Sequence, residues 1–167
     1  MNKRISNLVI PSLLFLAVAG SATAQDAPSS IAANQELANA RQMIQEGREA
    51  VIREELRLTA EEADGFWPLY EKYRAELMPI QDRYVALVAD YMQHYEAGSL
   101  TDENAEEMLD AYFDVKSDVL RLRKRYIRQF RKVMPMLKVA RFYQLENKMN
   151  ADIDIELAML VPLADGD

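Results

Sequence analysis

Apolar residues recur every three or four positions through residues 108–140, which is the spacing of one face of an α-helix. The pattern predicts a long helix with a single packing stripe. Pro135 lies inside this run and should kink the helix or split it in two. The stripe consists of Met108, Tyr112, Val115, Val119, Leu122, Tyr126, Phe130, Val133, Leu137 and Ala140.

Other segments have the same helical character. Residues 34–56 are rich in helix formers and place apolar residues at heptad spacing, although Gly47 weakens the middle. A second helix is expected between Thr59 and Gly98, which should end it. Pro68 predicts a bend in this helix, and Pro79 predicts a kink. No segment has the alternation of a strand. The pattern predicts an all-α fold of a few long helices with proline kinks.

Two threonines mark helix starts. Thr59 has Glu62 three residues later, which is a capping box, and Thr101 precedes two acids that suit the positive end of a helix dipole. Each threonine follows a leucine. The residues of these two motifs are Leu58, Thr59, Glu62, Leu100 and Thr101.

The segment 1–24 has the composition of an export signal. Lys3 and Arg4 precede an apolar stretch over 8–20, and Ala22-Thr23-Ala24 matches a cleavage site. The stretch is shorter than the ~20 residues of a membrane-spanning helix. We expect cleavage after Ala24, export to the periplasm and no stable membrane insertion afterwards; an uncleaved anchor is the alternative. The expected organisation is a signal peptide (1–24), a disordered leader (25–33), one helical domain (34–162) and a flexible acidic tail (163–167).

Composition narrows the classes of function. The chain has no cysteine and one histidine, His94, which excludes thiol catalysis and leaves too few ligands for a multi-histidine metal centre. It contains neither G-x-S-x-G nor H-E-x-x-H. We therefore expect a protein that is not an enzyme and has no required cofactor.

Charge is segregated along the chain. Residues 25–114 carry 20 acids and 7 bases, whereas residues 115–148 carry 11 bases and 2 acids. On an ideal helix, six of these bases fall within an arc of about 120°, nearly opposite the apolar stripe. They are Arg121, Lys124, Arg125, Arg128, Arg131 and Lys132.

This basic arc has two interpretations. It is either a solvated helix face, partly neutralised by acidic helices of the same molecule, or a recognition surface for acidic or unfolded polypeptides. The net charge of −7 and the predicted export argue against nucleic acid as a partner.

The two threonine motifs carry a family resemblance. Leu58-Thr59-Ala60-Glu61-Glu62 and Leu100-Thr101-Asp102-Glu103-Asn104 resemble the LTxxQ motif of Spy/CpxP-type periplasmic stress proteins, with Glu62 and Asn104 in place of the glutamine. Residues 135–148 also resemble the closing helix of that family, in which a proline turn precedes a basic segment.

The resemblance implies a cradle-like helical homodimer that binds unfolding proteins without ATP. It also implies a role in envelope stress, with the periplasmic domain of a sensor kinase as a candidate partner. The expected function is thus an ATP-independent chaperone or envelope-stress modulator that holds polypeptides on the basic arc. The alternatives are a periplasmic metal-responsive sensor or resistance protein and a non-catalytic structural adaptor.

The metal alternative depends on one pair of residues. Asp90 and His94 are four residues apart and can reach one ion, such as zinc or another divalent metal. Two ligands are too few for a complete site, so a second copy would have to supply the others. The simpler interpretation is a histidine near a helix end.

Aromatic residues cluster just after the first threonine motif. Phe66, Trp67, Tyr70 and Tyr73 lie within eight residues. Packing between helices is the expected role of this cluster, and part of a polypeptide-binding surface is the alternative.

Overall fold

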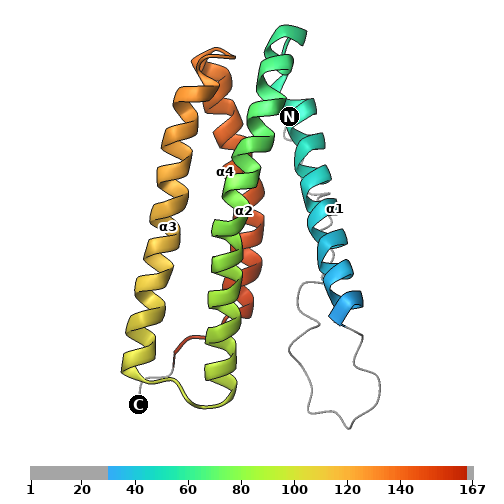
Figure 1. Ribbon diagram of the computed structural model, residues 1–167. Helices are drawn as coiled ribbons and strands as arrows, with labels where there is room; N and C mark the ends of the chain where they lie inside the picture. Colours follow the sequence, from blue (N-terminus) through green and yellow to red (C-terminus); the bar gives the residue numbers. More distant parts are fainter. Residues whose placement is uncertain (1–29, 165–167) are drawn as a thin grey trace. The chain divides into compact units, whose positions relative to one another are not determined.

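The computed structural model describes residues 30–164, and Figure 1 shows the path of the chain. Four helices account for most of these residues, and none of the described residues forms a strand. The predicted all-α class is confirmed. The helices are α1 (Ser30–Leu56), α2 (Ala60–Glu96), α3 (Asp102–Phe130) and α4 (Met136–Leu160).

The chain divides into two compact units, residues 1–55 and 56–167. The described part of the first unit is α1 up to Glu55. This helix runs unbroken through Gly47 and starts four residues before the expected position. The second unit holds the other three helices. One helical domain over 34–162 stays a prediction. The predicted signal peptide, leader residues 25–29 and tail residues 165–167 lie outside the described residues.

Helix α2 continues through both of its prolines, so the bend expected near Pro68 does not interrupt it. Each proline frees the carbonyl four residues earlier, on Asp64 or Ala75. Both of these residues are exposed, so water can satisfy the freed carbonyls. The predicted stop is confirmed: Gly98 has a φ of 61°, which favours glycine, and the chain then turns into α3.

Pro135 splits the predicted long helix in two. Helix α3 ends at Phe130, and Pro135 occupies the N-cap position of α4. The break resets the helix face, so the predicted stripe is wrong beyond it. Leu137 is 86% exposed and Ala140 is exposed, whereas Val139 and Phe142 are fully buried in their place. Upstream of the break, Val115, Leu122, Tyr126 and Phe130 are buried as expected.

An aromatic core joins α2, α3 and α4. Phe142 of α4 lies 5.4 Å from Phe66 of α2 and 4.9 Å from Phe130 of α3, measured between ring centroids. Tyr73 of α2 packs 5.3 Å from Tyr126 of α3. Such pairs stabilise beyond the area they bury. The core-packing interpretation of the aromatic cluster is confirmed, since Phe66, Tyr70 and Tyr73 are buried and Trp67 is half-buried.

One glycine marks a close approach of α2 to the turn after α3. A Cβ atom added to Gly65 would lie 2.9 Å from both Cβ and Cγ1 of Val133. This distance is shorter than van der Waals contact, so the absence of a side chain allows the two segments to meet. Within the described part of the chain, no helix has the length and apolarity needed to cross a membrane.

Candidate functional site: a charged groove and a basic turn surface

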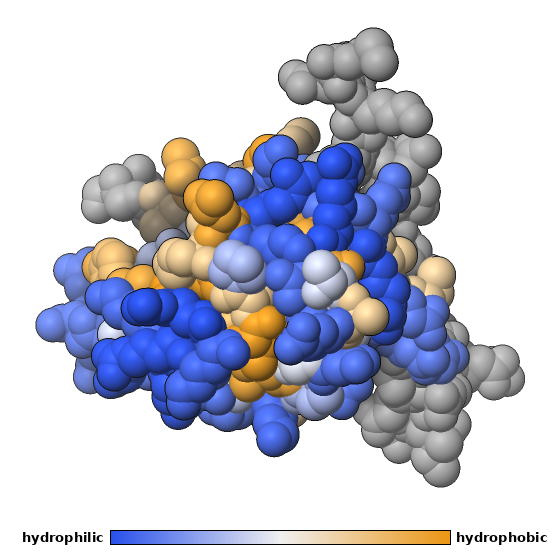
Figure 2. All heavy atoms as spheres, turned by 90° about the horizontal axis from the view of Figure 1, so that it is seen from above, coloured by the Kyte–Doolittle hydropathy of each residue, from blue (hydrophilic) through white to orange (hydrophobic). Residues whose placement is uncertain are grey.

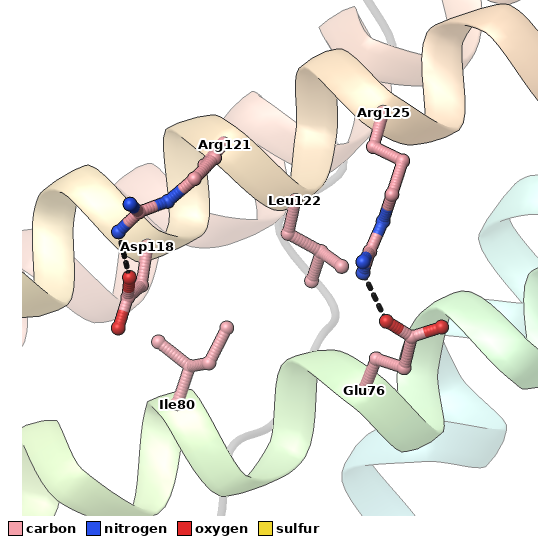
Figure 3. Close-up of a pocket in the computed structure, with 6 residues that line it drawn as sticks. All are labelled: Glu76, Ile80, Asp118, Arg121, Leu122 and Arg125. Carbon is pink, nitrogen blue, oxygen red and sulfur yellow. Dashed lines mark hydrogen bonds and ion pairs between the residues drawn. The ribbon is translucent and has the colours of Figure 1, made fainter.

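An open hollow of about 380 Å³ lies between α2 and α3. Its floor is apolar, because Ile80 of α2 and Leu122 of α3 extend toward each other between the helices (Figure 3). Charged side chains form its walls. The residues of this charged groove are Glu76, Ile80, Asp118, Arg121, Leu122 and Arg125.

Asp118 binds two arginines at one end of the charged groove. Arg83 reaches it from α2, and Arg121 reaches it from one turn further along α3. These two hydrogen bonds, that of Arg83 first, hold the pKa of Asp118 below its usual range. Arg121 therefore has an ion-pair partner within its own chain, a carboxylate that it shares with Arg83.

Glu76 has the same role at the other end of the charged groove. One of its oxygens pairs with Arg125, and the other accepts a hydrogen bond of 2.6 Å from the hydroxyl of Tyr126. Burial, and then this bond to a carboxylate, raise the pKa of Tyr126 to about 12. Two of the six cations of the predicted basic arc, Arg121 and Arg125, thus have partners in their own chain.

The other four cations of the arc are exposed. Within residues 30–164 their side chains make no ion pair or hydrogen bond. Shortly after them in the sequence, on the first turn of α4, Met136 and Leu137 are 52% and 86% exposed. Figure 2, which views this end of the molecule, shows hydrophobic residues among hydrophilic ones. We call this set the basic turn surface: Lys124, Arg128, Arg131, Lys132, Met136 and Leu137.

Both threonine motifs form capping boxes. The backbone N–H of Thr59 donates to Glu62 Oε2 at 2.8 Å, and the N–H of Glu62 donates to Thr59 Oγ1 at 3.3 Å. Thr101 and Asn104 make the same two bonds at 2.8 and 3.3 Å. The predicted helix starts are confirmed, and the leucines before them, Leu58 and Leu100, are half-buried.

Glu62 also ties the start of α2 to α4. Lys138 pairs with the Glu62 carboxylate and donates to the carbonyl of Arg57 at 2.9 Å. The hydrogen bond from Lys138 is the main reason why the pKa of Glu62 is below its ordinary value. This residue therefore joins two helices as well as capping one.

His94 and Asp90 face each other but gain no third ligand. His94 Nε2 lies 4.0 Å from Asp90 Oδ1, and Nδ1 lies 2.9 Å from Ser99 Oγ in the turn after α2. Asn104 Nδ2 lies 3.4 Å from the same Nδ1. Among the residues that the structure describes, no group of three histidine, cysteine or acidic side chains is placed to hold an ion.

Some residues of these sites were missed in the sequence. Glu76 pairs with Arg125 and Arg83 with Asp118 across two helices, and no local pattern indicates such distant partners. Asp118 has a weak signal, since Arg121 lies three positions later on the same helix. The exposure of Met136 and Leu137 was not predicted, because the apolar stripe was expected to continue past Pro135 with Leu137 on its packing face.

Comparisons with known proteins give no match: no family model, no curated protein and no solved structure matches this chain.

Proposed function

We propose that this protein is an exported, ATP-independent chaperone or envelope-stress modulator that binds unfolded or partner polypeptides on the basic turn surface. One observation carries the proposal: four exposed cations that have no ion-pair partner within residues 30–164 are followed along the chain by two exposed apolar side chains. Acidic residues dominate residues 25–114, so this surface is where an acidic or partly unfolded chain meets favourable charge.

The two kinds of side chain contribute differently. An exposed ion pair stabilises by about 0.2–1 kcal/mol and weakens with salt. Full burial of a leucine side chain contributes about 1.5–3 kcal/mol. The cations therefore mainly steer a polypeptide to the surface, and Leu137 with Met136 holds it there.

The capping boxes support the Spy/CpxP resemblance. The third residue of each helix accepts a hydrogen bond from the threonine N–H, through Glu62 Oε2 or Asn104 Oδ1. A glutamine carries an equivalent oxygen, so the departures from LTxxQ retain the capping role. The proposal accordingly includes a periplasmic location after cleavage at Ala24, a second copy of the chain as a partner and, as one candidate target, a sensor-kinase periplasmic domain.

Suppression of aggregation tests the proposal. A chemically denatured substrate is diluted into buffer without ATP, at low and high salt, with protein produced from the full coding sequence. We expect suppression near stoichiometric ratios that weakens with salt. Reversal of Arg128 and Lys132 to Glu should reduce it several-fold, and Leu137→Ser should reduce it at every salt concentration.

The matched control reverses two exposed lysines elsewhere, Lys72→Glu with Lys148→Glu, which changes the net charge equally. Arg121 and Arg125 are left intact because their reversal would break the ion pair of Arg121 with Asp118 on α3 and that of Arg125 with Glu76 of α2. If neither wild type nor control suppresses aggregation under any condition, the chaperone proposal is wrong. The adaptor function then becomes the better explanation, with the basic turn surface as its docking site.

The facing Asp90 and His94 side chains favour the metal-responsive sensor as a second candidate. Isothermal titration calorimetry with zinc tests the metal-sensor function. Micromolar binding that is lost in His94→Ala would support a sensor, whereas the chaperone proposal predicts that His94→Ala suppresses aggregation as well as wild type.

A further inference from the structure

The last turns of α4 are apolar on two opposite sides. At 100° per residue, Ile153 and Leu157 lie on the side of the helix that carries its buried residues, and both are half-buried. Ile155 and Met159 lie on the outward side and are 60% and 82% exposed. A helix at a protein surface normally has polar residues on its outward side, and one that is apolar all round is normally buried. This part of α4 therefore has the composition of a helix that another surface covers.

Exposed acids accompany these apolar side chains. Asp152 and Asp154 are exposed, and within the described part of the chain neither makes an ion pair. No base occurs between Lys148 and residue 164, so no neighbour along the chain neutralises them. Leu160 and Leu163 add two further exposed apolar side chains. We call this set the acidic apolar end: Asp152, Asp154, Ile155, Met159, Leu160 and Leu163.

The acidic apolar end lies far from the basic turn surface of its own chain. The hydroxyl of Tyr91, on α2 near the α2–α3 turn, donates a hydrogen bond of 2.9 Å to the carbonyl of Pro162, just after α4. The basic turn surface lies at the other end of α4, at the α3–α4 turn (Figure 1). The ends of a continuous helix of 25 residues are separated by about 37 Å, so these two surfaces cannot meet within one chain.

The two surfaces are complementary in charge, and both contain exposed apolar side chains. The basic turn surface has four exposed cations, whereas the acidic apolar end has two exposed carboxylates. Leu137 precedes Ile155 by about five turns, so both side chains point to the outward side of α4. Opposite charges steer two such surfaces together, and burial of the apolar side chains holds them. Two copies of the same surface would repel each other, so the contact joins unlike surfaces.

We propose that the acidic apolar end of one copy docks on the basic turn surface of a second copy. Asp152 and Asp154 then face the cations of that surface, which have no ion-pair partner within residues 30–164. Ile155 and Met159 pack against the exposed Met136 and Leu137. Because each copy offers one surface of each kind, the contact is repeated until the assembly closes.

A solvated helix end explains only part of this pattern. Exposed acids on the last turns of a helix need no partner, because water solvates them. Single exposed apolar residues are also normal, but several of them within consecutive turns indicate a contact surface. A basic polypeptide of another kind would satisfy the same chemistry. A second copy is the favoured occupant, because every copy of this chain carries a surface of matching charge and apolar content.

The contact has a regulatory consequence, which rests on the proposed function. A docked copy covers the cations that would steer a polypeptide to the basic turn surface. Self-association and polypeptide binding therefore compete for that surface. The acidic apolar end also indicates the class of polypeptide that the surface accepts: acidic segments whose apolar side chains lie on one side of a helix.

Charge reversal at each surface tests the contact. One variant carries Asp152→Lys and Asp154→Lys, and the other carries Arg128→Glu and Lys132→Glu. By sedimentation velocity, each variant alone should associate at least about tenfold more weakly than wild type, because like charges then face each other. A chain with all four substitutions should associate again, since its two surfaces are complementary with the signs exchanged. An equimolar mixture of the two variants should also associate, because each surface meets its opposite in the other variant.

The matched control is Glu54→Lys with Glu71→Lys, two exposed acids that belong to neither surface. This control changes the net charge as much as the first variant does, and it should associate like wild type. Circular dichroism verifies that each variant keeps its helix content. If a reversal unfolds the chain, Ile155→Ser with Met159→Ser serves as a substitute, since both residues are exposed, and it must also weaken association.

Three results would overturn the proposal. The first is a wild type that stays monomeric at high micromolar concentration, which would leave the acidic apolar end to a different partner. The second is association that both reversals leave unchanged, because the copies then meet through other surfaces. The third is a chain with all four substitutions that keeps its helix content but does not associate.

The sedimentation result does not depend on any polypeptide substrate, so loss of the chaperone proposal would leave the contact intact. The variant with Asp152→Lys and Asp154→Lys keeps the basic turn surface but cannot dock on a second copy. It should suppress aggregation more strongly than wild type at concentrations where wild type is associated. Equal suppression by both would refute the competition while leaving the contact itself standing.

Discussion

Replacement of Phe142 by alanine is the most direct test of how α4 joins the core. Phe142 is fully buried, and five aromatic rings lie within 6.0 Å of its ring centroid: Phe66, Tyr70, Tyr73, Phe130 and Tyr143. Loss of a buried phenylalanine costs about 3–5 kcal/mol. We expect a value near the upper end, because the aromatic pairs that are lost with the ring stabilise beyond the area they bury.

Leu137→Ala is the matched control on the same helix. Leu137 is 86% exposed, so its truncation should change the free energy of unfolding by less than about 0.5 kcal/mol. Trp67 is the only tryptophan and packs 5.1 Å from Phe66, so its fluorescence during urea unfolding reports on this core. Equal losses in the two variants would show that Pro135 does not reset the helix face, and would refute the packing described above.

Three further predictions concern other parts of the second unit. Gly65→Ala should lower stability by about 1–3 kcal/mol in urea unfolding, although alanine favours helices. Val133→Ala in the same chain should restore only part of the loss, because it removes Cγ1 but keeps the Cβ that also lies 2.9 Å from the added atom. Thr59→Ala should lower the free energy of unfolding by about 1 kcal/mol, because the N-cap hydrogen bond of α2 is lost. An unchanged free energy of unfolding would show that this cap does not stabilise the protein. The raised pKa of Tyr126, about 12, favours its neutral form in the folded state. The stabilisation that comes from the neutral Tyr126 hydroxyl is therefore complete below pH 10 and is lost as the pH rises from 10 to 12. Tyr126→Phe removes this titrating group, so the urea midpoint of the variant should fall less steeply than that of wild type over the same pH range.

Local signals in the sequence were sufficient to predict the helices. Thr59 and Thr101 mark their starts because capping depends on residues three positions apart, and Gly98 marks a stop because few other residues adopt its φ. The stripe of α3 was correct as far as Phe130. It failed at Leu137 because helical periodicity cannot show how far a proline turn rotates the next helix.

The candidate site was only partly predictable for a related reason. A helical projection placed six cations on one arc, but it could not show that Arg121 and Arg125 form ion pairs with Asp118 and Glu76. Glu76 reaches Arg125 from another helix, and that pairing depends on the register between α2 and α3. The role of Gly65 was not predictable for the same reason: a side chain at this position would meet Val133, and the sequence does not show that these two residues lie close together.

The position of the aromatic core has a consequence for local unfolding. The fully buried rings belong to the start of α2, the end of α3 and α4, whereas Tyr84, Tyr91, Tyr95 and Tyr112, toward the α2–α3 turn, are only half-buried. The free energy of local opening should therefore fall along the helical hairpin from the core toward Gly98. Backbone amides near Phe66 and Phe130 would exchange with solvent only on global unfolding. Backbone amides near the α2–α3 turn would exchange through local opening of the helix ends. The distance between α2 and α3 can therefore change at this end of the hairpin while the aromatic core stays intact.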